Sequence, residues 1–139
     1  MQQRQKGISY WGVVMAISLF GFAIKVGAAV GPIYLDYFTI TRMISGMFKE
    51  PAVDEQSIKD FEDGMARRMQ MNNLGEMSVK KIMRIHKDGK NFIVDVVYDK
   101  REPLIGNLDV IVSFRKSFSS ENPDGVDLPP EEAEAETVQ

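Results

Sequence analysis

The 139-residue sequence predicts an α+β protein with a transmembrane helix at its N-terminus. A long apolar stretch opens the chain, apolar residues then recur every three or four positions over residues 33–69, and from residue 82 they recur every second position. The expected elements, in order, are a transmembrane helix, two amphipathic helices, a three-stranded antiparallel β-meander and a disordered acidic C-terminal tail.

These elements divide the chain into a cytoplasmic N-terminus over residues 1–7, a transmembrane helix over 8–31, an extracytoplasmic α+β domain over 32–118 and a tail over 119–139. Residues 121–136 hold seven acidic residues and no Lys or Arg, which leaves 13 acidic against 17 basic residues elsewhere. The chain is therefore a basic body with an acidic tail. It has no cysteine, which excludes disulfides and thiolate chemistry.

The prediction of a membrane helix depends on the uncharged stretch from Ile8 to Ile24. About 20 mainly apolar residues cross the hydrocarbon core, and residues 8–28 supply them with Lys25 as the single charge. Lys25 would lie about 26 Å along the helix, where its side chain reaches the far headgroups. Arg4 and Lys6 before the stretch favour a cytoplasmic N-terminus.

A cleaved signal peptide is the alternative interpretation of the same stretch. The small residues Gly27, Ala28 and Ala29 resemble a cleavage region. Against cleavage, the apolar stretch exceeds the usual 7–15 residues and Lys25 lies where a cleavage region is neutral.

A second feature of the stretch is its small residues at spacings of four, Ala23, Gly27 and Gly31. Such a stripe lets another helix approach closely, so it is a candidate helix–helix interface. The alternative is that Gly and Ala are simply common in membrane helices.

Beyond Pro32, which should kink or loosen the helix, one amphipathic helix is expected to end before Pro51. A second is expected from an N-cap at Asp54 to about Asn72. The apolar faces are Ile33, Tyr37, Ile40, Ile44, Met47 and Phe48 in the first helix and Ile58, Phe61, Met65 and Met69 in the second.

Three strands are expected next, within residues 82–86, 92–99 and 108–114. Asp88-Gly89 between the first two favours a type I′ hairpin turn, and Gly106-Asn107 lies in the second loop. After Phe118 the chain is too polar to offset its ordering entropy, so we expect disorder there.

No catalytic, cofactor-binding or metal site is expected. The single histidine, His86, lacks an evident partner set, and a solvated strand-end histidine is the simpler interpretation. Asp95, Asp99 and Asp109 have no calcium-loop spacing and fit the polar face of a half-exposed sheet. We therefore predict a protein that is not an enzyme and has no small-molecule substrate.

Residues 80–116 hold nine basic and five acidic residues, which raises the question of an anionic partner. Membrane headgroups are one candidate, and solubility is the other explanation of the charge. No aromatic–basic platform for nucleic acid is present. The candidate membrane-surface contacts are Lys25, Lys100, Arg101, Arg115 and Lys116.

The segments Arg4–Gly7, Gly31–Tyr37 and Tyr98–Val110 carry a resemblance, most specifically in the run Pro-Leu-Ile-Gly-Asn-Leu-Asp. Over residues 4–118 the chain resembles uncharacterised proteobacterial single-pass inner-membrane proteins catalogued as a domain of unknown function. Members are often encoded beside the leader (type I signal) peptidase. The resemblance implies the bacterial inner membrane and a link to secretion, and it supplies no catalytic residues.

Two functional classes follow. In the first, the protein is an accessory or scaffold subunit that binds another membrane protein, leader peptidase being one candidate, or itself. In the second, it is a pilin-like (pseudopilin) subunit, because Lys6-Gly7 before an apolar helix has the outline of a prepilin. The acidic residue expected five positions into such a mature chain is replaced by Gly12.

Overall fold

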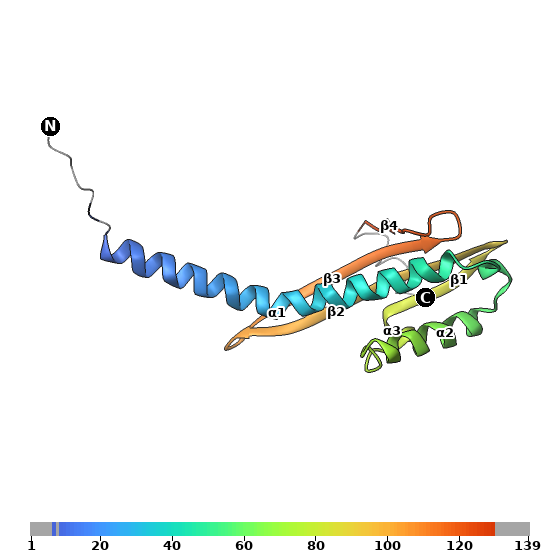
Figure 1. The fold of residues 1–139 in the computed structure, drawn as a ribbon, viewed down its shortest axis with the longest axis horizontal. Coiled ribbons are helices and arrows are strands. Elements are labelled where there is room, and N and C mark those ends of the chain that lie inside the picture. The colour runs from blue at the N-terminus through green and yellow to red at the C-terminus, as the bar shows by residue number, and fades with distance from the viewer. Residues whose placement is uncertain (1–6, 8, 130–139) are drawn as a thin grey trace, which may run out of the picture.

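The computed structural model describes residue 7 and residues 9–129. It confirms an α+β protein with a long apolar N-terminal helix, shorter helices and an antiparallel sheet (Figure 1). The sheet has four strands in the order β1-β2-β3-β4, one more than expected. The elements are α1 (Tyr10–Phe48), η1 (Val53–Glu55), α2 (Ile58–Met71), α3 (Val79–Ile82), β1 (Met83–Asp88), β2 (Asn91–Ile105), β3 (Leu108–Ser119) and β4 (Val126–Asp127).

The expected transmembrane helix and first amphipathic helix are one continuous helix of 39 residues, with Pro32 inside it. The expectation of separate helices was therefore wrong. A proline removes one backbone hydrogen bond and crowds the carbonyl four residues earlier, which bends a helix without ending it. Figure 1 shows α1 changing direction between its apolar half and the half that crosses the sheet. The expected boundary between residues 31 and 32 falls inside this helix.

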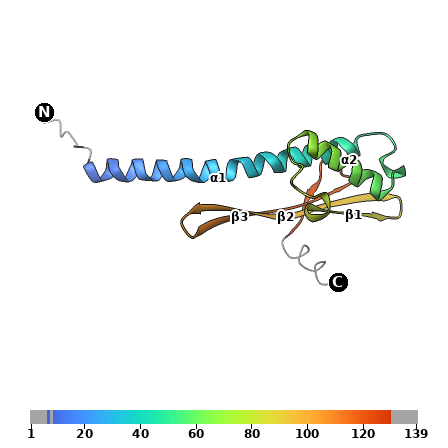
Figure 2. The same ribbon diagram turned by 90° about the horizontal axis from the view of Figure 1, so that it is seen from below.

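One face of α1 packs on the sheet, and Figure 2 shows the helix lying along it. Ile33, Ile40 and Ile44 are buried on that face, as the spacing predicts. The same stripe continues towards the N-terminus through the half-buried Val26 and Val30. Residues 9–25 are all exposed, so the packed face of α1 begins at Val26.

Helix α2 begins one turn later than expected. Its N-cap is Ser57, whose hydroxyl accepts a hydrogen bond from the Asp60 backbone N–H at 3.1 Å. The Asp60 carboxylate also accepts from that hydroxyl, and these bonds to Ser57 lower the pKa of Asp60. Asp54, the expected N-cap, lies instead in η1 and contacts the Ser120 hydroxyl.

The first hairpin turn is displaced by one residue from the Asp-Gly pair. Asp88 pairs with Asn91, so the two-residue loop is Gly89-Lys90, with a positive φ of 61° at Gly89. This is the pattern of a type II′ turn in place of the expected type I′. The register follows from the alternation in β2, whose buried Phe92, Val94 and Val96 would all turn outward after a slip of one residue.

Residues 119–129 are ordered against the domain, so the expectation of a disordered tail from residue 119 was wrong for this segment. Strand β4 pairs with β3 through Val126 and Ser117, and Asp124 forms an ion pair with Lys49 at 2.8 Å. The expectations for residues 1–6, 8 and 130–139 lie outside the described residues.

Candidate functional site

The apolar half of α1 carries more exposed large apolar side chains than any other element of the described chain. An 18-residue window of this helix has a mean hydropathy of 2.2 and none of it is buried. Trp11, Leu19 and Phe20 are each at least 70% exposed. Such a helix near the N-terminus is consistent with a single membrane anchor or a signal sequence.

The small residues expected to form a helix–helix interface lie beside the packed face of α1, with Gly27 exposed and Gly31 half-buried. Gly27 and Gly31 each follow a packed residue, Val26 and Val30, by one position, which turns them about 100° around the helix. A Cβ built on either glycine meets no described atom within 4 Å. Ala23 is exposed in the same way.

The end of the β2–β3 hairpin forms a second exposed apolar surface, which the sequence analysis missed. Its two-residue loop is Gly106-Asn107, flanked by the pair Ile105 and Leu108, which are 53% and 57% exposed. Figure 1 shows this hairpin running beside α1 towards its apolar half, and Figure 2 shows the same direction. The clue in the sequence was the uncharged run over residues 103–108, in which a loop with Pro103, Gly106 and Asn107 was expected to lead into a strand beginning at Leu108.

The five cations predicted to touch a membrane lie in different parts of the structure. Lys25 lies on α1, and Lys100 and Arg101 lie in the outer part of β2, where Arg101 forms an ion pair with Asp109. Arg115 pairs with Asp99 at 3.2 Å, and the Lys116 ammonium lies 5.6 Å from the centre of the Phe118 ring. Lys116 is eight residues beyond Leu108, about 27 Å along an extended strand. The five do not form one surface.

The remaining ionisable candidates are each occupied by a local contact. His86 lies within β1, half-exposed, with its Nδ1 3.8 Å from an Asp95 carboxylate oxygen. Asp95 also accepts a hydrogen bond from the Ser117 hydroxyl. Among residues 7 and 9–129, no three His, Cys, Asp or Glu side chains come together in a way that could hold a metal ion.

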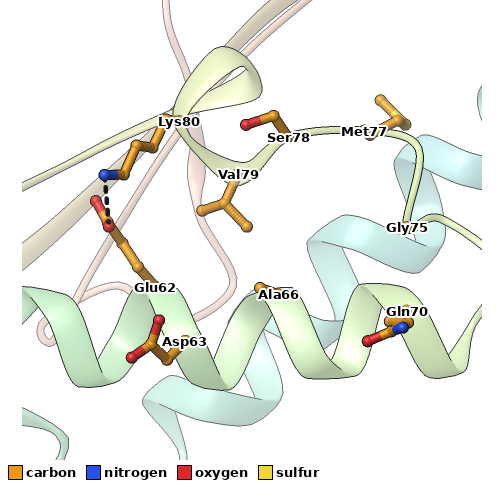
Figure 3. A pocket seen from close by; sticks show the side chains of 9 residues that line it. All are labelled: Glu62, Asp63, Ala66, Gln70, Gly75, Met77, Ser78, Val79 and Lys80. Atoms are coloured by element: carbon orange, nitrogen blue, oxygen red, sulfur yellow. Dashed lines mark ion pairs between the residues drawn. The ribbon is translucent and has the colours of Figure 1, made fainter.

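One open hollow of about 600 Å³ lies between α2 and the segment that leads into α3 (Figure 3). Glu62 and Lys80 form an ion pair of 3.8 Å across one end of it, as Figure 3 shows, while Gln70 and Gly75 line the other end. Asp63 and Ser78 also line the hollow. It lies on α2, away from the apolar half of α1.

Between α1 and the sheet lies a cluster of aromatic rings around Phe114. Tyr37 stacks on Phe114 with centroids 4.2 Å apart, and Tyr98 lies 5.1 Å from the same ring. Burial, together with the nearby Asp36 carboxylate, raises the pKa of Tyr98 far above its ordinary value. The Tyr98 hydroxyl makes no hydrogen bond to any described residue, so the cluster has the character of a packing contact.

These features define a class: an α+β domain built directly onto the second half of a long N-terminal apolar helix. The chain belongs to the family described as Domain of unknown function (DUF4845), whose model matches residues 29–114. The match takes in α1 from Ala29, helices α2 and α3, strands β1 and β2, the turn that follows, and β3 as far as Phe114. The comparison with curated proteins found no match, and neither did the comparison with solved structures.

Proposed function

We propose that this protein is a single-pass inner-membrane protein that acts as a non-catalytic accessory or scaffold subunit for another membrane protein, with a link to protein secretion. The observation that carries the proposal is the continuity of α1. Its first half is exposed and apolar, and its second half supplies Ile40, Ile44 and Phe48 to the domain core. With no flexible linker between them, an anchor of this kind fixes the position of the domain above the bilayer.

Continuity also favours a retained anchor over a cleaved signal sequence. The small residues that would form a cleavage region, Gly27 to Ala29, lie inside the helix and beside packed positions. A signal peptidase site would therefore interrupt the element that carries the core. The anchor places the N-terminus in the cytoplasm and the domain in the periplasm, following the charges of Arg4 and Lys6.

The proposed partners are the lipid bilayer and a second membrane protein, or a further copy of this chain. Leader peptidase is the first candidate to test, because the family resemblance links the two genes. We propose no substrate, cofactor or nucleic acid. Within the sheet, Asp99 pairs with Arg115 and Asp109 with Arg101, so these four groups already have partners.

A pilin-like subunit is the second candidate function, and one observation favours it. A protruding apolar half-helix that continues into a helix packed on an antiparallel sheet is the general outline of such subunits. The substitution of Gly12 for the acidic residue counts against it. Cleavage between Gly7 and Ile8 is required by this candidate and by no other.

The test is photo-crosslinking of the full chain in its native membrane. Photoreactive residues at Ala23, Gly27 and Phe38 sample exposed positions along α1, and Lys59 on exposed α2 is the matched control position. A reproducible adduct to a different membrane protein from α1 supports the accessory function and identifies the partner. Adducts to lipid alone overturn it.

Intact-mass analysis of the same preparation separates the alternatives. An uncleaved chain is expected. Loss of residues 1–7, together with adducts only between copies of this chain, would establish the pilin-like candidate, and cleavage near residue 28 would establish a signal sequence.

A further inference from the structure

The distance that the β2–β3 hairpin extends along α1 follows from two independent observations. First, Phe114 contacts Tyr37, and Leu108, the first residue of β3, lies six residues before Phe114 on the side of the hairpin turn. Six residues of extended strand span about 20 Å, which equals about 13 residues of helix and places the turn near Lys25. Second, burial on α1 begins at Val26. Both observations put the hairpin turn at the level of residues 24–26 of α1.

This level lies within the length of helix that a bilayer requires. About 20 residues cross the hydrocarbon core, and 20 residues counted from Tyr10 end at Ala29. The turn beside Val26 is therefore about 5 Å inside the boundary, or roughly one helical turn. If α1 spans the membrane, the end of the hairpin enters the outer leaflet with it.

The residues at the end of the hairpin are uncharged and mostly apolar, as a position inside the outer leaflet requires. Residues 103–108 carry no charge, and Ile105 and Leu108 expose more than half of their surface to the surroundings. The charges begin immediately behind, with Glu102 on one strand and Asp109 on the other. Asp109 is largely covered by its ion pair with Arg101, so the charge nearest the end is neutralised.

We propose that the turn of the β2–β3 hairpin, residues 103–108, inserts into the outer leaflet beside α1, with Lys25, Lys100 and Arg101 at the lipid headgroups. The turn lies at the boundary between headgroups and acyl chains, into which amphipathic elements insert by about 5–10 Å. This second point of attachment fixes the rotation of the domain about α1. The inference rests on the proposed membrane anchor.

The experiment uses the full chain in vesicles of phosphatidylethanolamine and phosphatidylglycerol. Because the sequence has no cysteine and a single tryptophan, two reporters can be read separately. An environment-sensitive fluorophore is attached to Ile105→Cys or Leu108→Cys, and Trp11 reports the anchor in the unlabelled chain. Val126→Cys in β4 is the matched control, since Val126 is 55% exposed and equally apolar.

Lipids brominated in their acyl chains are expected to quench Trp11, and to quench the fluorophore at positions 105 and 108 several-fold more than at position 126. Quenching of Trp11 with equal, weak quenching at 105, 108 and 126 would overturn the inserted hairpin and leave the anchor standing. An unquenched Trp11 would overturn the anchor, and the inserted hairpin with it.

A charge variant tests whether the fluorophore itself, and not the hairpin, drives insertion. In a chain labelled at Asn107→Cys, the pair Ile105→Asp and Leu108→Asp is expected to abolish the quenching, because two carboxylates at this depth are costly. Both side chains are exposed, so the fold is retained, and Val126→Asp is the control that leaves the quenching unchanged. Quenching that persists in the double variant would contradict the proposal.

Discussion

The ring of Tyr37 in α1 stacks on the ring of Phe114 in β3, with centroids 4.2 Å apart and planes inclined by 13°. This contact lies where the hairpin leaves the main core and continues beside α1. Tyr34 meets the same Phe114 ring edge-on at 5.4 Å. Phe114 therefore attaches the hairpin to the helix through contacts with two tyrosines of α1.

Replacing Phe114 by alanine should reduce stability strongly. Phe114 is 5% exposed, and its truncation leaves a cavity against Tyr37 and Tyr98. We expect the free energy of unfolding in detergent to fall by about 3–5 kcal/mol, as measured by denaturant titration. Ile111→Ala on the opposite face of β3, where the side chain is 61% exposed, should change it by less than about 0.5 kcal/mol. Equal effects would refute a packing role for Phe114.

The segment 119–129 should detach from α1 in acid. Hydrogen bonds from Lys49 and then Ser45 lower the pKa of Asp124, so its carboxylate stabilises the docked segment at pH values above its ordinary pKa of 3.8. That stabilisation is lost as the pH falls through the lower folded value. The protection factors of amides 119–128, which correct for the slower intrinsic exchange in acid, are therefore expected to fall on acidification below about pH 4.

Asp124→Asn should remove this pH dependence and give fast exchange in the same amides at neutral pH. Glu121→Gln is the matched control, because Glu121 is exposed and lies in the same segment. An Asp124→Asn variant that keeps slow exchange would mean that β4 pairing alone holds the segment.

Two glycine substitutions should act in opposite directions. Gly125 has a positive φ of 78°, and an added Cβ would lie 2.7 Å from the Phe118 ring. Gly125→Ala is therefore expected to destabilise the protein by at least about 1–2 kcal/mol. Gly46→Ala lies inside α1 with no atom near the new Cβ, and it should stabilise by about 0.5–1 kcal/mol. Thermal unfolding of both variants checks the signs, and the same sign in both would refute the conformational argument.

The small-residue stripe on α1 can be tested without disturbing the domain. Gly27→Leu and Gly31→Leu place a large side chain where no described atom lies within 4 Å. If this line is a helix–helix interface, photo-crosslinked adducts from Ala23 should fall several-fold, because a leucine side chain prevents the close approach of a second helix. Gly21→Leu, equally open but on another side of the helix, is the matched control. Unchanged adducts in both variants would show that the stripe is not an interface.

Local pattern predicted most of the secondary structure. The spacing of Ile33, Ile40 and Ile44 identified the packed face of the helix, because a period of 3.6 residues brings such positions to one side. The alternation from Phe92 to Tyr98 identified the buried face of β2 in the same way. The absence of charge over residues 8–24 predicted the apolar helix that the structure places at the N-terminus.

Local sequence pattern did not predict the type of the first hairpin turn or the ordered segment 119–129. Asp88-Gly89 favours one turn type locally, yet the pairing of Lys87 with Phe92 shifts the loop by one residue. The polar composition of residues 119–129 predicts disorder, but Lys49 and β3 supply partners that lie far away in the sequence. Each outcome depends on a neighbour that local composition does not reveal.

The sequence by itself determined the order of elements, the apolar helix and the faces that pack, because these depend on periodicity and charge along the chain. The tertiary structure decided that α1 continues through Pro32, that a fourth strand joins the sheet, and that the β2–β3 hairpin runs beside α1 towards its apolar half. The reason is that the level of the turn depends on the length of β3 measured from the contact of Phe114 with Tyr37, a contact between residues 77 positions apart.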